Sequence, residues 1–445
     1  MKAVIIGGDA AGMSAASQIK RQKPEWEVIV FEKGDYISYA ACGIPFYIEG
    51  LIPKRESLIE LTPDEAINKR KIDLRLNHEA IKIVPERKEL IVRNSSGEFV
   101  ETYDKLMIAT GSRPNTLEID IGSFDNLFTV KDIPSGDRIK DFIELRSTKK
   151  IAIIGGGNIS IELAEAIREH EIETILIHRR ETLHKSYEPE ISDIIIDKLM
   201  QKGVIVKLEY RFEGIKQDGN CLKVITDKEI VDADGVILSL GMIPNTEIAK
   251  DAGIELGVNN AIKVNEYSET SITDIYSSGD CATSNMINFN LELYSPLALK
   301  ANKQGMSGGF NMTGKKEKFA GVLNTSIIKV FDLGIARTGL TLEDATTLGL
   351  DPVKLNLKSK DRAGYYPGSS EITSIVIISR KDRRVLGAQL AGKIESVKRI
   401  DVYSTIIHNN MTIDKVFNLD LAYAPPFSTV YDPVLLAARV GRKKV

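Results

Sequence analysis

A single cysteine near the N-terminus has neighbours that suit thiol chemistry. Cys42 lies in the run Ser38-Tyr39-Ala40-Ala41-Cys42-Gly43-Ile44-Pro45, where the proline predicts the first turn of a helix. A thiolate at a helix N-terminus is stabilised by the helix dipole, so we expect its pKa to lie below the free-cysteine value of about 8.5. The alternative is a small buried apolar cysteine, which is the commoner role of a lone thiol. Nucleotide-binding motifs in the same chain favour the reactive thiol.

The composition excludes several function classes. The chain has 445 residues and a net charge of −3, which gives no overall attraction to nucleic acid or to a membrane surface. Its three cysteines are far apart and its five histidines have no ligand spacing, so we expect neither a disulfide framework nor a metal site. Cys221 and Cys281 are weaker redox candidates than Cys42. Because neither a signal peptide nor a run of about 18 apolar residues is visible, the expected location is the cytoplasm.

The N-terminal residues follow the order of a dinucleotide-binding unit. A strand over 3–6, a helix over 13–21 and a strand over 27–31 are predicted, and Glu32 follows the second strand. The turn after the first strand directs backbone N–H groups at a pyrophosphate, and the acid accepts hydrogen bonds from ribose hydroxyls. This turn consists of Gly7, Gly8, Asp9, Ala10, Ala11 and Gly12. Aspartate replaces the middle glycine of the usual pattern, but the full order still predicts a bound nucleotide.

A second copy of this unit begins at residue 151. It has a strand over 151–154, a helix over 161–169 and a strand over 174–177. Its turn consists of Gly155, Gly156, Gly157, Asn158, Ile159 and Ser160. The second strand ends in His178-Arg179-Arg180 instead of an acid. Arginines at this place suit the 2′-phosphate of NADPH, whereas a solvated charge pair is the alternative; two such units predict two dinucleotides, FAD and NADPH.

A similar segment closes each unit and supports duplication. A strand at 105–108 runs into Ala109-Thr110-Gly111, and a strand at 235–238 is followed by Gly241. Farther on, a strand at 275–278 ends in Gly279-Asp280, whose carboxylate could accept hydrogen bonds from a ribityl chain. In isolation this dipeptide is more often a plain turn.

The character of the chain changes after the charged linker at 315–318. Strands are predicted over 322–331, 372–379 and 385–392, and helices over 342–348 and 396–409. We therefore expect a separate α+β domain over 320–445, without a nucleotide turn and suited to an interface. Two of its loops carry aromatic residues beside proline and glycine: Gly364-Tyr365-Tyr366-Pro367-Gly368 and Tyr423-Ala424-Pro425-Pro426-Phe427.

Nearly the whole chain resembles the flavin-dependent pyridine nucleotide–disulfide oxidoreductases, in the branch with a single redox cysteine. Three signatures carry the resemblance: Ala109-Thr110-Gly111, Gly279-Asp280 and Pro296-Leu297-Ala298. Tyr47 stands where a second cysteine would complete a CxxxxC dithiol. The run from Cys42 to Tyr47 is most similar to coenzyme A disulfide reductases and to the related persulfide or sulfur reductases. Asparagine often precedes the cysteine in that family, and here the residue is Ala41.

The resemblance implies an α/β architecture of two dinucleotide-binding, Rossmann-like domains and a C-terminal α+β dimerisation domain. FAD is expected on residues 1–115 and 246–318, NADPH or NADH on 116–245, and the homodimer interface on 320–445. The implied cofactor contacts are Gly7, Gly8, Asp9, Ala10, Ala11, Gly12, Glu32, Lys33, Ala80, Ala109, Thr110, Gly111, Asp280, Pro296, Leu297, Ala298, Gly155, Gly157, Asn158, Ile159, Glu162, His178, Arg179, Arg180 and Gly241.

The same resemblance implies a reaction and a substrate site. Cys42 would form a mixed disulfide with coenzyme A, with Ser38 nearby, while Tyr423 and one of Tyr365 and Tyr366 reach the sulfur from the other subunit. The substrate is thus a small-molecule disulfide or persulfide. The positions implied for the coenzyme A nucleotide are Ser14, Gln18, Arg21 and Lys71, of which the two cations suit phosphates.

Two other functions keep the flavin but change its use. In an NAD(P)H oxidase, Cys42 would cycle through a sulfenic acid while oxygen is reduced. Related NADH peroxidases carry a histidine in the first glycine turn, where this chain has Ala10, which argues against a peroxidase. The third hypothesis is a flavoprotein redox sensor with little turnover, although an intact second nucleotide site favours steady electron transfer.

Overall fold

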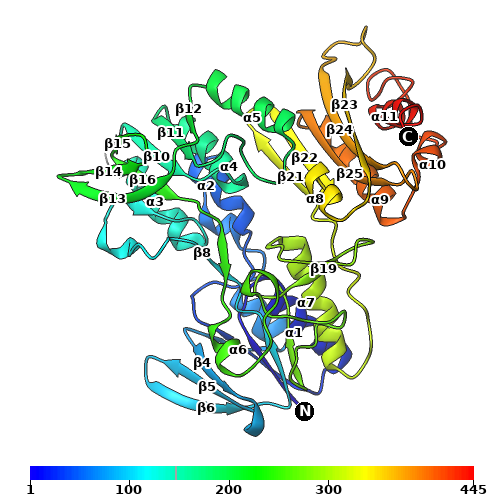
Figure 1. The fold of residues 1–445 in the computed structure, drawn as a ribbon. Coiled ribbons are helices and arrows are strands. Elements are labelled where there is room, and N and C mark those ends of the chain that lie inside the picture. The colour runs from blue at the N-terminus through cyan, green and yellow to red at the C-terminus, as the bar shows by residue number, and fades with distance from the viewer. Residues whose placement is uncertain (146–147) are drawn as a thin grey trace.

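The computed structural model describes residues 1–145 and 148–445 and consists of three units that meet around the short helix α2 (Ile44–Glu49), as Figure 1 shows. Two units are built on parallel five-stranded sheets and the third on an antiparallel five-stranded sheet. The predicted α/β class is therefore confirmed. Among the described residues, no helix combines the length and the apolar character needed to cross a bilayer.

The first unit has a parallel sheet that is buried on both faces. Its strand order is β18-β7-β1-β2-β3. Alternate residues of β1 face opposite sides, so Ile5 packs toward the helices and Val4 toward a second, small sheet. The strands are β1 (Lys2–Ile6), β2 (Glu27–Glu32), β3 (Asp73–Leu76), β7 (Lys105–Ile108) and β18 (Ile275–Ser277). The small sheet is formed by β4 (Glu79–Val84), β5 (Glu89–Asn94) and β6 (Gly97–Thr102).

Two helices, α1 (Ala10–Gln22) and α7 (Ala298–Met312), pack closely against each other in this unit. Glycines on α7 allow the approach, because a Cβ atom on Gly305 would lie 2.3 Å from the carbonyl oxygen of Ala11. A Cβ atom on Gly309 would lie 2.5 Å from the carbonyl oxygen of Ala15. The chain therefore returns through β18 and then α7 to complete a unit that began at residue 1.

The second unit repeats this plan with the strand order β12-β11-β10-β16-β9. A small antiparallel sheet again covers one face, through Leu222 and Val224. The main strands are β9 (Leu127–Phe128), β10 (Lys150–Ile154), β11 (Glu173–His178), β12 (Ile205–Leu208) and β16 (Gly235–Leu238). The small sheet consists of β13 (Phe212–Asp218), β14 (Cys221–Thr226) and β15 (Ile230–Ala233), and the helices are α3 (Ile133–Leu145), α4 (Asn158–Arg168) and α5 (Pro189–Gln201).

A two-stranded ribbon connects these two units. In it, β8 (Ser112–Pro114) pairs antiparallel with β17 (Met242–Pro244). The Thr110 hydroxyl donates to the Asn245 carbonyl at 2.6 Å, and the Asn245 side chain donates to the Thr110 carbonyl at 2.9 Å. The chain then passes through α6 (Glu247–Asp251), β19 (Ser284–Met286) and β20 (Leu291–Leu293) to α7.

The C-terminal unit is an antiparallel sheet of order β21-β22-β25-β24-β23. The strands are β21 (Ser326–Val330), β22 (Leu333–Gly339), β23 (Pro352–Lys360), β24 (Glu371–Ser379) and β25 (Val385–Lys393). The helices are α8 (Leu342–Thr347), α9 (Ile400–His408), α10 (Ile413–Phe417) and α11 (Pro433–Gly441). Three of the strands and two of the helices were predicted from the sequence, whereas β22, β23 and the C-terminal helices were not.

Candidate active site

Cys42 lies at the junction of the first two units. It occupies a 3₁₀ turn, Ala41–Gly43, that leads directly into α2, and its residue surface is exposed. The second unit holds α2 in place, since the Tyr47 hydroxyl donates to Asp137 at 2.8 Å and His170 Nε2 lies 2.7 Å from the carbonyl oxygen of Ile48. The helix that follows the thiol therefore has a fixed position relative to both nucleotide-binding units.

The predicted fall in the pKa of Cys42 is wrong for this structure. Burial of the thiol among groups of both units raises its pKa although the residue remains accessible, and Glu162 raises it further. Lys131 is the cation that opposes this effect. The helix that follows has only six residues, and Cys42 precedes it by a turn, so the dipole does not outweigh burial and nearby carboxylates.

One of the aspartates near the thiol has a pKa that burial shifts. Burial raises the pKa of Asp9 to about 6, while Lys131 lowers it. Asp280 lies 3.7 Å from the Lys131 ammonium and also accepts a hydrogen bond from Ser112 at 3.3 Å. Lys131 was not predicted as a site residue, because only the fold brings the loop between β9 and α3 to the end of β18.

The first glycine turn has the close backbone packing that a nucleotide cradle requires. Gly7 has a φ of +102°, and a Cβ atom there would lie 2.2 Å from the carbonyl oxygen of Ala109. A Cβ atom on Gly12 would lie 1.9 Å from the carbonyl oxygen of Gly7. The segment Ala109-Thr110-Gly111 thus closes against the turn, and the residues present fit the group that the motif predicts. Pro296, Leu297 and Ala298 form the start of α7, which has no side-chain N-cap.

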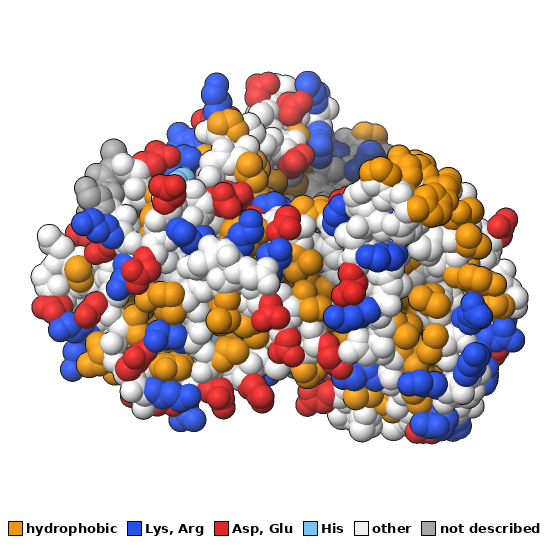
Figure 2. All heavy atoms as spheres, turned by 90° about the horizontal axis from the view of Figure 1, so that it is seen from above, with side chains coloured by type: hydrophobic (Ala, Val, Ile, Leu, Met, Phe, Trp, Pro, Cys, Tyr) orange, Lys and Arg blue, Asp and Glu red, His pale blue; other side chains and the backbone are white. Residues whose placement is uncertain are grey.

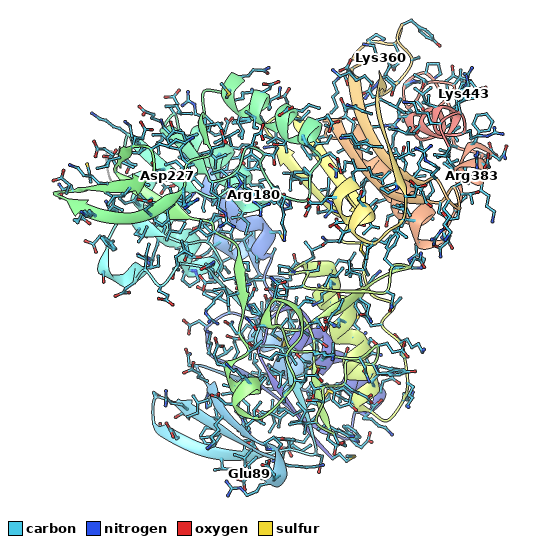
Figure 3. All side chains as sticks on the ribbon, viewed as in Figure 1. Glu89, Arg180, Asp227, Lys360, Arg383 and Lys443 are labelled. Carbon is cyan, nitrogen blue, oxygen red and sulfur yellow. The ribbon has the colours of Figure 1, made fainter. Side chains whose placement is uncertain are left out.

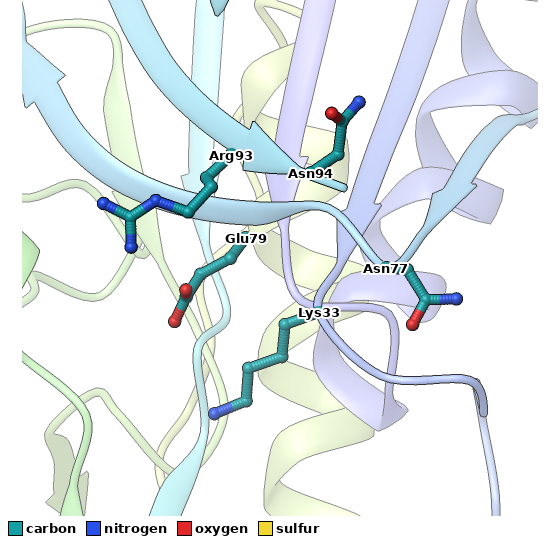
Figure 4. A pocket seen from close by; sticks show the side chains of 5 residues that line it. All are labelled: Lys33, Asn77, Glu79, Arg93 and Asn94. Atoms are coloured by element: carbon teal, nitrogen blue, oxygen red, sulfur yellow. The ribbon is translucent and has the colours of Figure 1, made fainter. Parts of the chain in front are cut away.

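Glu32 organises the backbone beside this turn. Its carboxylate accepts from the Gly8 N–H at 2.7 Å and from the Gly34 N–H at 2.8 Å. Next to it lies an open polar pocket, shown in Figure 4, in which Glu79 lies between the side chains of Lys33 and Arg93. The predicted residues Lys33 and Ala80 therefore border one end of the cradle, since Ala80 follows Glu79 in β4. The remaining lining residues are Asn77 and Asn94.

Ser38 connects the cradle to the thiol segment. It has a left-handed φ of 43°, and its N–H donates to the carbonyl oxygen of Gly8 at 3.1 Å. Asp9 accepts from the N–H of Tyr39 at 3.3 Å. These bonds place the chain from Ser38 to Cys42 along the same edge as the first turn.

The second glycine turn repeats the geometry of the first. Gly155 has a φ of +142°, and a Cβ atom there would lie 2.1 Å from the carbonyl oxygen of Ser239. Asn158 accepts from the Tyr187 hydroxyl at 3.0 Å. Ile159 is the second residue of α4, and Gly241 has a φ of +98° at the entry to the connecting ribbon.

The strand end that follows this turn carries the predicted cations. Arg179 and Arg180 are both exposed, and their guanidinium groups form no hydrogen bond or ion pair with the described residues. Figure 3 marks Arg180 at this end of the second unit. The ring of His178 packs behind the turn, 2.7 Å from the position of a Cβ atom on Gly156. Burial, and then the two arginines, lower the pKa of His178.

Two glutamates of α4 face the centre of the molecule. Burial and the neighbouring Glu165 raise the pKa of Glu162 to about 7. Glu165 is 2% exposed and forms an ion pair with Lys329 of β21, and its other oxygen accepts from the Phe331 N–H at 2.7 Å. Lys329 also lies 3.7 Å from Glu49 at the end of α2. This cluster joins all three units, and none of Glu49, Glu165 and Lys329 was selected in the sequence analysis.

Three of the four residues predicted for the coenzyme A nucleotide lie on α1, and the fourth, Lys71, lies in another segment. Ser14 donates to Asn302 of α7 at 2.8 Å, and Gln18 is half-buried one turn later. Arg21 donates to the Ser17 carbonyl at 3.1 Å. Arg70, which the sequence analysis did not select, donates to the Ser17 hydroxyl at 2.7 Å, and the exposed Lys71 follows it. The fold therefore gathers cations from two segments at the end of α1.

The two aromatic loops meet in the C-terminal unit. Ala363 N–H donates to the Pro425 carbonyl at 3.2 Å, and a hydrogen bond with Tyr365 raises the pKa of Tyr423. Tyr365 is 79% exposed, whereas Tyr366 is 37% exposed. Within one chain the loop between β23 and β24 lies at the far end of the C-terminal unit from α2 (Figure 1).

The other cysteines occupy different surroundings. Cys281 is fully buried and lies 3.5 Å from the carbonyl oxygen of Ile108. Cys221 begins β14 in the small sheet of the second unit and donates to Asp234 at 3.6 Å. Across the described residues, no group of histidine, cysteine and carboxylate side chains could hold a metal ion.

Comparisons with known proteins identify the family of this chain. Residues 1–305 match the family model described as pyridine nucleotide-disulphide oxidoreductase, and residues 325–433 match the dimerisation domain of that family. The chain belongs to this family. The match places it among NAD(P)H-dependent oxidoreductases, with a C-terminal unit of the dimerisation type.

Full-length relatives carry more specific names. A "NAD(P)H sulfur oxidoreductase (CoA-dependent)" of Pyrococcus furiosus is 40% identical over 99% of this chain and 98% of its own length. A "Coenzyme A disulfide reductase" of Staphylococcus haemolyticus is 32% identical over 97% of each chain. The solved NAD-dependent persulfide reductase from A. fulgidus is 36% identical, with a TM-score of 0.96 over 100% of this chain and 83% of its own.

Proposed function

We propose that this protein uses FAD and NAD(P)H to reduce a disulfide or persulfide of coenzyme A through Cys42. The observation that carries the proposal is the exposed Cys42 thiol at the junction of the two units that contain the glycine turns, with Tyr47 in place of a second cysteine. The names of the full-length relatives supply the substrate class.

Residues 1–115 and 246–318 would hold FAD in this proposal. The pyrophosphate would lie at the turn from Gly7 to Gly12, with Glu32 at the ribose end and Asp280 and the start of α7 at the end nearer Cys42. Asp280 is assigned to that end because its charge acts on the pKa of the Cys42 thiol. FAD, when bound, supplies two-electron transfer between the pyridine nucleotide and sulfur.

The segment 116–245 would bind the pyridine nucleotide. Its turn from Gly155 to Asn158 would face the pyrophosphate, and Arg179 and Arg180 would bind the 2′-phosphate of NADPH. Both guanidinium groups are free of partners in the described part of the chain, so a phosphate would displace no existing ion pair. NADPH is therefore proposed over NADH.

Cys42 would act as the nucleophile toward sulfur. Its Sγ attacks one sulfur of the substrate; a new bond forms between Cys42 and coenzyme A, the original sulfur–sulfur bond breaks, and the second thiol leaves with the electron pair. Two electrons later cleave the mixed disulfide and release the coenzyme A thiol. Lys131 assists the thiolate, because it is the cation that lowers the pKa of Cys42.

A second subunit would complete the site. In the same chain, the loop between β23 and β24, which carries Tyr365 and Tyr366, lies at the far end of the C-terminal unit from α2 (Figure 1), and the segment that carries Tyr423 is hydrogen-bonded to it. Large side chains of the C-terminal unit, Phe427 and Tyr431 among them, are exposed, and Figure 2 shows hydrophobic side chains gathered over this unit. We propose a homodimer in which these loops supply a proton to the leaving thiolate. Ser14, Gln18, Arg21 and Lys71 would hold the coenzyme A nucleotide.

Mass spectrometry of protein purified without reductant tests the proposal. The unaltered chain and a Cys221→Ser control should carry a coenzyme A adduct and should reduce coenzyme A disulfide, whereas Cys42→Ser should lose both properties. Native turnover by Cys42→Ser would contradict the proposal. A sulfenic acid on Cys42 without an adduct, together with oxygen consumption, would favour the NAD(P)H oxidase instead. Fast flavin reduction with negligible turnover would favour the redox sensor.

A further inference from the structure

Lys300 is a buried lysine that the proposed mechanism does not use. It lies in the first turn of α7 and is 2% exposed. Its ammonium donates to the carbonyl oxygens of Gly279 at 2.7 Å and of Ala282 at 2.8 Å, and no carboxylate of the described residues forms an ion pair with it. Because burial of a cation is costly when no anion compensates it, a buried lysine with only carbonyl partners requires an explanation.

The two carbonyl partners lie on either side of Asp280 and Cys281. Lys300 is thus fixed beside the turn that carries Asp280, and Ala298 precedes it by two residues at the start of α7. Both places belong to the proposed flavin site. They lie at its reactive end, because Asp280 affects the pKa of the Cys42 thiol and is 3.7 Å from Lys131.

We propose that Lys300 is a built-in positive charge that stabilises the reduced flavin and so raises the midpoint potential of the cofactor. The inference rests on the proposed FAD site. Reduction by NAD(P)H transfers a hydride, which is two electrons and one proton, so one negative charge is gained unless a second proton follows. A cation in a buried site of low dielectric constant stabilises that charge far more than a cation in water would.

The N-terminus of α7 acts in the same direction. The helix has 15 residues, and no side chain caps its first N–H groups. The partial positive charge of this end therefore adds to that of Lys300. On the opposing side, the charged and titratable groups that act on Lys300 are Asp280 and Cys281.

Titration of Lys300 provides a second signature. Burial lowers the pKa of Lys300 to about 8, while Asp280 and Cys281 raise it. Lys300 is thus positively charged at neutral pH, and it loses its proton and its charge above about pH 8. Added negative charge on reduction would restore the proton, so reduction above this pH takes up one additional proton.

Potentiometric titration of the flavin-loaded protein against a reference dye, without NAD(P)H or substrate, tests the inference. Lys300→Met removes charge and donor, whereas Lys300→Gln removes the charge and keeps a donor. Both should lower the equilibrium constant for two-electron reduction at least tenfold, about 30 mV. Lys303→Met is the matched control, since Lys303 is exposed on the same helix, and its potential should not change.

Each other result has a defined meaning. If Lys300→Gln binds flavin and keeps the original potential, Lys300 only ties the turn to α7 and the inference is wrong. Should both variants fail to fold, the unaltered protein remains decisive: its potential must fall more steeply above pH 8, by up to about 30 mV per pH unit, and a constant slope overturns the inference. Absence of flavin from the unaltered protein would instead overturn the proposed function.

Discussion

Helices α1 and α4 follow the same sequence pattern in the two parallel-sheet units, but different interactions hold them in place. Each follows a buried strand and a glycine turn, and each turn excludes a Cβ atom at its first glycine. Helix α1 is fixed by close backbone packing on the glycines of α7. Helix α4 is fixed by charge, through Glu165 and Lys329 of the C-terminal unit.

The side chains at matching positions make the difference clear. Ser14 and Ser17 stand on α1 at the same distances from the first glycine as Glu162 and Glu165 on α4. Both serines form hydrogen bonds within the first unit, Ser14 with Asn302 and Ser17 with Arg70. By contrast, Glu162 acts on the pKa of Cys42, and Glu165 pairs with Lys329 of the C-terminal unit. A duplicated unit can therefore keep its backbone while its helix acquires a role in joining the others.

The largest effect, on flavin binding, is expected when the first glycine turn receives the serine that the second turn has at the matching position. Ser160 occupies the place in the second turn that Gly12 occupies in the first. Gly12→Ser should abolish flavin binding, because its Cβ atom would lie 1.9 Å from the Gly7 carbonyl oxygen. Ser160→Gly, the reciprocal control, should change stability by less than about 1 kcal/mol. Flavin absorbance and thermal unfolding measure both; equal effects would mean that the turns do not differ.

Removal of the ionic clamp on α4 is expected to be the next largest effect. Lys329→Met leaves the buried Glu165 without its cation, which should lower the free energy of unfolding by about 3–5 kcal/mol. Lys198→Met is the control, because its partner Asp332 is exposed and such pairs contribute about 0–1 kcal/mol. Denaturant unfolding compares the two. If both variants lose a similar free energy of unfolding, the ion pair between Lys329 and Glu165 does not hold α4 in place, and the contrast with α1 fails.

The free energy of unfolding should depend on pH because Glu162 of α4 has a raised pKa. Glu162 has a pKa of about 7 in the folded protein against 4.5 for the free side chain. A raised folded pKa gives stability that is fully present below pH 4.5 and lost as the pH rises through 7, a difference of about 3 kcal/mol. Glu162→Gln should flatten the fall between pH 4.5 and 8 in unfolding experiments, while Ser14→Ala should leave it in place. An unchanged pH profile in Glu162→Gln contradicts the assignment.

The smallest effect, on the preference for NADPH over NADH, is expected from the residues at the ends of β2 and β11. Glu32 ends β2, whereas Arg179 and Arg180 follow β11. Arg179→Glu combined with Arg180→Ala should lower the preference for NADPH over NADH by roughly 1.5–3 kcal/mol for each charged hydrogen bond lost. The ratio of kcat/KM values for the two nucleotides measures this, and flavin content should stay constant because the first unit is untouched. A constant ratio would identify the arginines as a solvated pair.

Local patterns predicted much of this molecule. The strand, turn and helix around Gly7 and around Gly155 are present as expected, since buried strands and glycine turns are encoded in consecutive residues. The predicted strand over 322–331 covers β21 and ends before β22 (Leu333–Gly339), which no prediction covered. The pKa of Cys42 was predicted in the wrong direction, because the prediction used its own helix and neither the burial of the thiol nor the carboxylates that the fold brings near it.

The order of residues by itself determined which backbone segments could cradle a dinucleotide, because the required glycines, strands and helices are contiguous. The sequence also has Tyr47 at the position where a second cysteine would complete a CxxxxC dithiol with Cys42. Only the tertiary structure decided that Lys131 would stand beside that sulfur, that Lys329 would clamp α4, and that Lys300 would be buried beside Asp280. Such charges come from distant parts of the chain, and their energies depend on burial and distance, which no local pattern contains.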